Sequence, residues 1–213
     1  MKITTLIFDL GGVIINIDPS RSINEFKSLS NNNNLFDGLD YKNNQASSLL
    51  NFFFDFEKGL IDEVSFRNRL NKIGNFNLNK QRIENIWNKV IVSINFNLID
   101  LILKLKSHYK VMILSNTNSI HERYYKSICL KKYGFDFKVL FNKVYYSHEL
   151  NLRKPEPEIY KLILRENKLD PKEIIFFDDI IENIIAAEKV GFNTFKVSYI
   201  DTLEKYLKTI FVI

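Results

Sequence analysis

A short apolar segment that leads an aspartate into a glycine turn constrains this chain more than any other feature. Residues 3–8 form an apolar, partly β-branched run, Asp9 follows at once, and the turn continues through Leu10, Gly11 and Gly12. A run this short and apolar is typical of a strand in the buried centre of a parallel sheet. The carboxyl ends of such strands are where α/β proteins place their chemistry. Because a buried carboxylate is unfavourable without a counter-charge, we expect Asp9 to meet a metal ion or a cation.

Partners for Asp9 occur later in the chain. Polar side chains follow two further apolar runs and one turn: Ser115 with Asn116, Lys154, and Asp178 with Asp179. The carboxyl ends of parallel strands meet at one edge of a sheet, so we expect these groups to lie together. Together these groups indicate a site for phosphate and metal. They comprise a nucleophile, a hydroxyl and amide pair, a lysine and two acids.

Two different periodicities divide the chain. From residue 96 onward, strand-like and helix-like segments alternate, which predicts an α/β fold with a Rossmann-like parallel sheet and helices on both faces. Between residues 18 and 95 no fully apolar strand is evident, and apolar stripes recur at helical spacing. We therefore predict a core domain of residues 1–17 and 96–213, with a small helical cap domain of residues 18–95 inserted in it. An asparagine run at 31–34 is expected to be a loop.

Composition narrows the class of protein. The hydrophobic content of 46% is enough for a core, and the single Cys129, expected to be buried, excludes an internal disulfide and fits a reducing cytoplasm. We expect no signal peptide and no membrane partner, because no apolar run approaches the roughly 18 residues of a membrane span. The net charge of +5 comes from scattered lysines, so no nucleic-acid partner is predicted. Oligomeric state is left open.

Four motifs in this order resemble the haloacid dehalogenase superfamily of phosphohydrolases. Residues 8–13 resemble its first motif, residues 114–116 its second, residues 153–155 its third, and residues 177–179 its fourth. The resemblance spans the chain from Asp9 to about residue 191. Residues 115–118 and 153–156 look most like the branch that includes alpha-glucose-1-phosphate phosphatase. The resemblance implies a Mg²⁺-dependent phosphomonoester hydrolase acting on a small phosphorylated metabolite, with sugar phosphates as candidates.

The resemblance also implies roles for the nucleophile and the metal ligands. Asp9 would attack phosphorus and form an aspartyl-phosphate, which divides one difficult displacement into two. Mg²⁺ would be held by Asp9, by the backbone carbonyl of Gly11 and by Asp179, since hard oxygen ligands suit this ion. Asp178 would act on the metal through water, or orient Asp179 and Lys154.

A second group of residues would bind the phosphate of the substrate. Ser115 and Asn116 would offer a hydroxyl and an amide to its oxygens, and Lys154 would supply a positive charge to phosphate and nucleophile alike. The backbone N–H groups of Leu10 and Gly11 would form an anion-binding turn beside them. The cap domain would cover the site, exclude water and select the substrate.

Gly11 departs from the pattern of the superfamily. Most of its phosphatases carry a second aspartate two residues after the nucleophile, which protonates the leaving oxygen and later activates water. Without it, general acid–base catalysis would weaken by roughly 10²–10⁴-fold. We therefore expect substrates whose leaving group departs easily, such as anomeric sugar phosphates. Asp18 would substitute if the chain folded back, although Asp18-Pro19 is also a turn signal.

Two other functions remain open. One is a metal-independent haloacid dehalogenase that uses Asp9 to attack carbon, which the glycine at position 11 and the pair Asp178-Asp179 argue against. The other is a catalytically weak relative that binds a phosphorylated ligand or a partner protein, and Gly11 is its best support.

Overall fold

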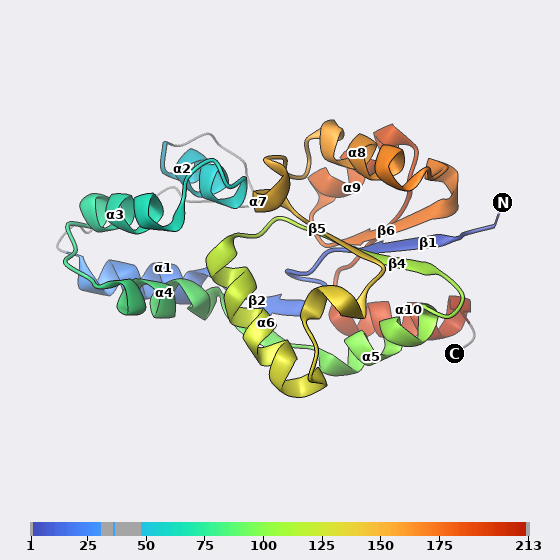
Figure 1. The fold of residues 1–213 in the computed structure, drawn as a ribbon, viewed down its shortest axis with the longest axis horizontal. Helices are drawn as coiled ribbons and strands as arrows, with labels where there is room; N and C mark the ends of the chain where they lie inside the picture. The colour runs from blue at the N-terminus through green and yellow to red at the C-terminus, as the bar shows by residue number, and fades with distance from the viewer. Residues whose placement is uncertain (1, 31–35, 37–47, 212–213) are drawn as a thin grey trace.

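A five-stranded parallel sheet forms the core of this computed structural model, which describes residues 2–30, 36 and 48–211 (Figure 1). The asparagine run at 31–34 lies outside the described residues. In sheet order the strands are β5 (Lys143–Tyr146), β4 (Lys110–Ser115), β1 (Thr5–Phe8), β6 (Ile174–Asp178) and β7 (Asn193–Lys196). The central strand β1 pairs in parallel with β4 and β6, so residues that follow these three strands meet at one edge.

Helices cover both faces of the sheet, and side chains of β1 alternate between the two layers. Leu6 and Phe8 pack in one apolar cluster with α5 (Phe96–Leu105), α6 (Ser119–Tyr133) and α10 (Ile200–Phe211). Ile7 packs in the other with α8 (Pro157–Asn167) and α9 (Ile181–Val190). A single turn of helix, α7 (Ser147–Leu150), follows β5. Cys129 is buried, as predicted. The predicted α/β core with helices on both faces is confirmed.

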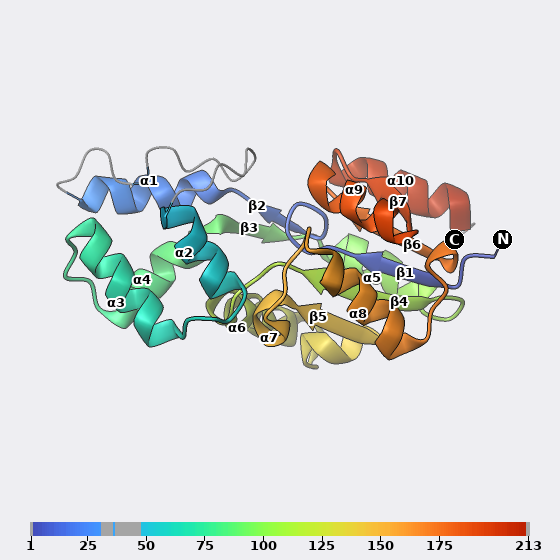
Figure 2. The same ribbon diagram turned by 90° about the horizontal axis from the view of Figure 1, so that it is seen from above.

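Within the described part of the chain, four helices form a separate lobe at one end of the molecule (Figure 2). This helical lobe consists of α1 (Pro19–Leu29), α2 (Ser48–Glu57), α3 (Glu63–Gly74) and α4 (Lys80–Trp87). Aromatic rings fill its interior: the ring of Phe66 lies 4.0 Å from that of Phe56 and 5.3 Å from that of Phe52, centroid to centroid. Asn79 caps α4 by accepting a hydrogen bond from the N–H of Arg82.

A two-stranded antiparallel ribbon joins the helical lobe to the core, and it corrects the sequence analysis. Strand β2 (Ile15–Ile17) pairs with β3 (Ile91–Ile94), which lies in a region predicted to hold only helices. The pattern missed β3 because its middle residues are exposed, so it lacks the continuous apolar character of a core strand. The proposed boundaries at 17/18 and 95/96 fall at the ends of this ribbon, and the division into two domains stays a proposal.

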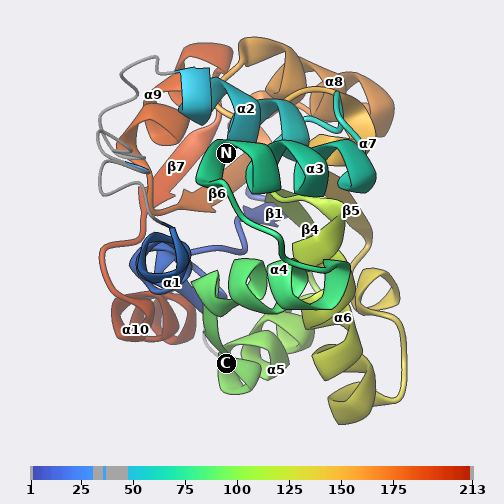
Figure 3. The same cartoon turned by 90° about the vertical axis from the view of Figure 1, so that its left-hand side faces the viewer.

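Short 3₁₀ turns lie between the longer elements: η1 (Asn88–Val90), η2 (Phe137–Leu140) and η3 (Pro171–Glu173). Seen from the end that carries the helical lobe, α2, α3 and α4 lie in front of the sheet (Figure 3). Among the described residues, no helix combines the length and the apolar character that crossing a bilayer requires.

The aromatic interior of the helical lobe gives a test of its packing. Phe66 is fully buried, so Phe66→Ala should lower the free energy of unfolding by about 3–5 kcal/mol. The sole tryptophan, Trp87, lies 4.8 Å from the Phe66 ring, so its fluorescence during urea unfolding reports on this lobe. Val64→Ala on the same helix removes a side chain that is 58% exposed, and should change stability by less than about 0.5 kcal/mol. Equal losses in the two variants would contradict this packing.

Candidate active site

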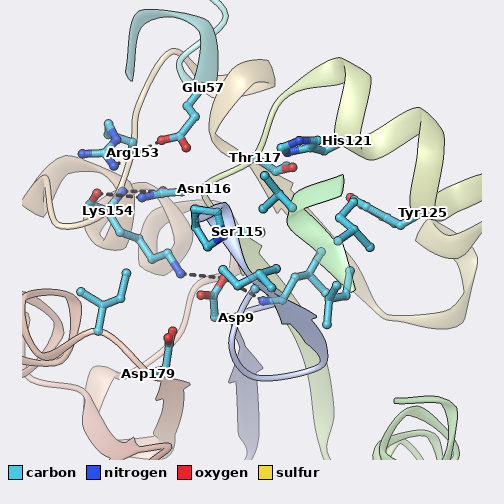
Figure 4. Close-up of a pocket in the computed structure, with 18 of the residues that line it drawn as sticks. Asp9, Glu57, Ser115, Asn116, Thr117, His121, Tyr125, Arg153, Lys154 and Asp179 are labelled. Carbon is cyan, nitrogen blue, oxygen red and sulfur yellow. Dashed lines mark hydrogen bonds and ion pairs between the residues drawn. The ribbon is translucent and has the colours of Figure 1, made fainter. Parts of the chain in front are cut away.

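A pocket of about 210 Å³ lies where the carboxyl edge of the sheet meets the helical lobe (Figure 4). The predicted site residues that line it are Asp9, Leu10, Gly11, Ser115, Asn116, Lys154 and Asp179. Asp178, fully buried, lies directly behind them. The helical lobe contributes the opposite wall, which includes Phe54, Glu57 and Trp87. The structure therefore brings together all the residues predicted from the four separate motifs.

Lys154 links the ends of β1 and β6. Its ammonium nitrogen Nζ lies 2.9 Å from Oδ1 of Asp9 and 2.6 Å from Oδ2 of Asp178, and the side chain is 1% exposed. Burial by itself would lower the pKa of Lys154, but the carboxylates of Asp178 and Asp9 outweigh it and raise this pKa. Lys154 is therefore a permanent positive charge at the floor of the pocket.

Asp178 is held entirely by donors of the protein. Its Oδ1 accepts hydrogen bonds from the N–H of Ile180 at 2.8 Å and from Nδ2 of Asn183 at 3.0 Å. Its Oδ2 accepts from Lys154 and, at 3.1 Å, from the same amide of Asn183. Both oxygens are thus engaged, which suits a residue that positions Lys154. The sequence analysis gave Asn183 no role.

Asp9 and Asp179 belong to a cluster of acids that the single charge of Lys154 does not balance. Oxygens of Asp9, Asp178 and Asp179 lie within 4.8 Å of one another. Burial and the repulsion of the neighbouring acids raise the pKa of Asp9 to about 8. The positive charge of Lys154 opposes this rise without cancelling it. Burial and the charge of Asp178 raise the pKa of Asp179 to about 6. The Oδ1 atom of Asp179 is buried without a hydrogen-bond partner, a costly arrangement that a bound cation would relieve.

The charge count indicates the kind of cation that fits. If all three carboxyl groups were ionised, they would exceed the single ammonium of Lys154 by two negative charges, which a divalent ion would balance. The donors are all carboxylate oxygens, which suit a hard ion such as Mg²⁺. The residues present therefore fit the predicted metal.

Gly12 allows this cluster to form, although the sequence analysis gave it no role. Its φ of +77° is one that residues with a Cβ rarely adopt. A Cβ built at Gly12 would lie 2.3 Å from Oδ2 of Asp179, far inside contact distance. Only glycine lets the backbone of the first motif approach the carboxylate of the fourth. The Gly11-Gly12 pair in the sequence was the signal for this approach.

The second motif is tied to the third through backbone hydrogen bonds. The amide nitrogen of Asn116 donates to the carbonyl of Lys154, and its amide oxygen accepts from the N–H of Lys154, both at 2.9 Å. Asn116 therefore fixes the segment that carries Lys154, whereas its predicted contact with phosphate stays a prediction. Ser115 is 2% exposed at the end of β4 and lines the pocket. The N–H of Leu10 donates to Oδ1 of Asp9 at 2.7 Å.

Glu57 and Arg153 form an ion pair across the pocket that the sequence analysis did not identify. The guanidinium nitrogen Nη2 of Arg153 lies 3.3 Å from Oε2 of Glu57. The same guanidinium lies 3.6 Å from the ring centroid of Phe54, over its face. Burial raises the pKa of Glu57, and Arg153 opposes this rise without cancelling it. Arg153 belongs to the third motif, but nothing in the local sequence marks Glu57 as its partner.

Two other polar residues, His121 and Asp18, have structural roles here. Both nitrogens of His121 are engaged, with the carbonyl of Trp87 and with Asn118, each at 3.1 Å. Burial lowers the pKa of His121 to about 4, so it is neutral and donates to Trp87. Asp18 caps α1 by accepting from the N–H of Ser20, and it is absent from the pocket lining.

Comparisons with known proteins agree with the motifs. The sequence model of the haloacid dehalogenase-like hydrolases matches residues 3–191. The chain is 29% identical over 197 residues to D-ribitol-5-phosphate phosphatase of Bacteroides thetaiotaomicron, and the match covers 91% of each.

Solved structures agree as well. A haloacid dehalogenase family enzyme from Bacteroides thetaiotaomicron, in complex with magnesium and inorganic phosphate, superposes with a TM-score of 0.79 at 34% identity, over 91% of this chain and 93% of that one. A predicted hydrolase of the same family from Porphyromonas gingivalis gives a TM-score of 0.81 at 26% identity, over 98% and 99%. Magnesium, the predicted cofactor, is thus the metal that one of these structures contains. The predicted enzyme class, a phosphatase of this superfamily, is confirmed: the chain belongs to the haloacid dehalogenase-like hydrolases.

Proposed function

We propose that this protein is a Mg²⁺-dependent phosphomonoester hydrolase that acts on a small sugar or polyol phosphate. The observation that carries the proposal is the cluster of buried carboxyl groups at the floor of the pocket, where Asp9 and Asp179 lie beside a single lysine, Lys154, and Oδ1 of Asp179 has no hydrogen-bond partner. A site that binds a divalent cation beside a fixed ammonium group is suited to a phosphate dianion.

The metal would be held by the carboxylates of Asp9 and Asp179 and by the backbone carbonyl of Gly11. When bound, Mg²⁺ neutralises the repulsion between an anionic nucleophile and an anionic phosphate. Asp178 would not contact the metal directly, because its oxygens are occupied by Lys154, Asn183 and the N–H of Ile180.

Asp9 is the nucleophile in this proposal. One of its carboxylate oxygens attacks phosphorus, the bond to the leaving oxygen breaks, and water then hydrolyses the aspartyl-phosphate. Lys154 and Ser115 bind the phosphate oxygens together with the N–H groups of Leu10 and Gly11. Asn116 holds the backbone of Lys154 in place, which fixes the reach of its ammonium group toward Asp9.

The substrate class rests on the relatives and on the pocket. One relative is named a D-ribitol-5-phosphate phosphatase, and the magnesium complex described above also contains inorganic phosphate. The helical lobe closes one side of the pocket with apolar groups and with Glu57, which pairs with Arg153 of the core, and this lining suits a small hydroxylated molecule. We propose that residues 18–95 act as a cap that excludes water. The cytoplasmic location stays a prediction from the single cysteine.

Replacing the nucleophile tests the reaction. Asp9→Asn should lower the hydrolysis of p-nitrophenyl phosphate by roughly 10³-fold or more, because amide oxygen is a poor nucleophile. EDTA should abolish the activity of the unaltered protein and Mg²⁺ should restore it. Asp18→Asn is the matched control, since asparagine caps helices as well as aspartate and Asp18 does not line the pocket. Chloride release from 2-chloropropionate would favour the dehalogenase instead, and inactivity in both assays would favour a binding protein.

Gly12 tests the metal site separately from catalysis. Gly12→Ala should weaken Mg²⁺ binding about 10- to 100-fold by displacing the carboxylate of Asp179. Gly134→Ala is the control, because Gly134 has a similar φ of +74° but nothing within 4 Å of its Cβ position. Both variants share the backbone strain, so only the clash distinguishes them. Calorimetric titration with Mg²⁺ measures the affinities, and equal affinities in the two variants would contradict the proposed site.

The raised pKa values predict how pH affects stability. An acid whose pKa is higher in the folded chain binds more protons when folded, so the free energy of unfolding falls as pH rises. Asp9 makes this contribution between pH 3.8 and about 8, and Asp179 between pH 3.8 and about 6. Their part of the stability of the metal-free protein should fall across this range.

Mg²⁺ should raise the melting temperature more at the upper end of that range, since its ligands must be ionised. Thermal unfolding with EDTA and with Mg²⁺, at several pH values within this window, measures the difference. A stabilisation by Mg²⁺ that does not change with pH would argue against carboxylate ligands with raised pKa values.

A further inference from the structure

The proposed reaction needs a proton that the first motif cannot supply. Departure of a primary alkoxide, as from a polyol phosphate, is slow unless an acid protonates the leaving oxygen. Gly11 stands where an aspartate would do this, and a Cβ there would lie 3.2 Å from Cδ1 of Ile17, so that side of the pocket is apolar. The proton must therefore come from another wall.

Glu57 is the remaining carboxyl group among the described residues that line the pocket. Asp9 and Asp179 are taken by the nucleophile and the metal. Lys154 is held between two carboxylates, and neutral His121 has both nitrogens engaged. Tyr125 also lines the pocket, but burial raises the pKa of its hydroxyl well above the ordinary value, which makes it a poor proton donor.

Glu57 faces the reacting centre from the lobe side. Figure 4 shows its side chain reaching from the end of α2 toward Asn116 and Lys154, across the cavity from Asp9. The side chain is 21% exposed and has one ion-pair partner, Arg153, at 3.3 Å. A substrate bound by its phosphate at Lys154 would place its leaving oxygen between the floor and this wall.

The surroundings of Glu57 suit both forms of an acid–base residue. Burial raises its pKa against the opposing charges of Arg153 and Lys154, so the carboxyl group retains a proton to higher pH than an exposed glutamate does. After the proton has left, the guanidinium of Arg153 stabilises the carboxylate.

Contacts on either side of Glu57 fix it against the core. Oγ of Ser147 donates a hydrogen bond to the carbonyl of Glu57, and Nδ2 of Asn151 donates to the carbonyl of Lys58 at 2.8 Å. Lys58 also forms an ion pair with Glu156 at 2.9 Å. These contacts hold the last turn of α2 on the core, so the carboxyl group of Glu57 is presented at a defined position.

Gly59 extends this attachment. With a φ of +67°, its Cβ position lies 2.2 Å from the carbonyl oxygen of His148, so the backbone of the lobe lies directly on that of the core. An approach this close is available only to glycine, and it sets the distance between the end of α2 and the pocket floor.

We infer that Glu57 is the general acid–base residue of this enzyme and supplies from the helical lobe the function that Gly11 lacks, an inference that rests on the proposed function. In the first step an Oδ–P bond forms at Asp9, the bond from P to the substrate oxygen breaks, and Glu57 gives its proton to that oxygen, which leaves as the alcohol. In the second step water attacks phosphorus and loses a proton to Glu57, and the bond between Asp9 and P breaks. Phosphate leaves, and both side chains return to their starting forms.

The test compares leaving groups that need a proton with one that does not. Glu57→Gln keeps the shape of the side chain and removes the acidic proton of the carboxyl group. Its kcat/KM for D-ribitol 5-phosphate and for phenyl phosphate should fall, by roughly 10²–10⁴-fold for the alkyl ester. Its kcat/KM for p-nitrophenyl phosphate should stay within about 3-fold, because p-nitrophenolate leaves without protonation.

The second step gives an independent signature in the same variant. Water attack on the aspartyl-phosphate loses its base, so Glu57→Gln should release a burst of p-nitrophenolate, up to one per active site, before a slow steady state. Asp55→Asn on the same helix is the matched control, since Asp55 does not line the pocket and should leave both substrate classes unchanged. Glu57→Asp, which keeps a carboxyl group, should recover part of the activity on the alkyl ester.

The outcomes separate this inference from the proposed function. Equal losses of kcat/KM on alkyl and p-nitrophenyl esters, or no loss on either, would overturn the role of Glu57 while leaving the phosphatase intact. Unaltered protein that hydrolyses no phosphomonoester would overturn the proposed function and this inference with it. Should Glu57→Gln fail to fold, the leaving-group dependence of Glu57→Asp decides, because a displaced acid must still penalise the alkyl ester more.

Discussion

The imbalance of buried charge at the end of β1 and β6 is the constraint on which the rest of this structure depends. Asp9, Asp178 and Asp179 lie within 4.8 Å of one another, with only Lys154 inserted among them. Such a cluster is unfavourable unless further positive charge arrives or protons are taken up. The raised pKa values of Asp9 and Asp179 express this imbalance, and a divalent cation removes it.

The four charged groups at this edge form two pairs with different surroundings, Asp178 with Lys154 and Asp9 with Asp179. Asp178 is saturated by donors of the protein and fixes Lys154, whereas Asp9 and Asp179 keep oxygen atoms directed at the pocket. The parallel sheet brings the ends of β1 and β6 together, and Gly12 lets the first turn approach Asp179. The same edge is closed by a lobe whose attachment at Gly59 leaves no room for a Cβ. The proposed metal site and the pocket beside it are therefore built on regular secondary structure and glycine turns.

The sequence predicted the parts of this molecule that depend on local pattern. The buried run before Asp9 and the motifs after β4 and β6 could be placed, because a strand that is covered on both faces is apolar throughout. Strand β3 could not, because its outward-facing residues interrupt that pattern. The partners of Asn116 and the clearance at Gly12 also escaped prediction, since both depend on distances between segments far apart in the chain.

Glu57 illustrates the same limit for function. Its helix lies in the region where apolar stripes recur at helical spacing, but a single glutamate among such residues gives no sign that it faces Asp9 across a pocket. The expectation that a missing acid at Gly11 restricts the enzyme to easily departing leaving groups considered only the first motif and Asp18 as sources of the proton. A carboxyl group supplied by the lobe would lift that restriction, and would make closure of the lobe a condition for catalysis.

The central claim is that Asp9 and Asp179 share one divalent cation while Asp9 attacks phosphorus. A crystal structure grown with Mg²⁺ and beryllium trifluoride, which mimics a phosphoryl group on a carboxylate, tests it most directly. The account predicts Mg²⁺ bound by both carboxylates, beryllium attached to an oxygen of Asp9, and the ammonium group of Lys154 facing the fluorides. Magnesium bound away from these two residues, or beryllium attached to any side chain other than Asp9, would contradict it.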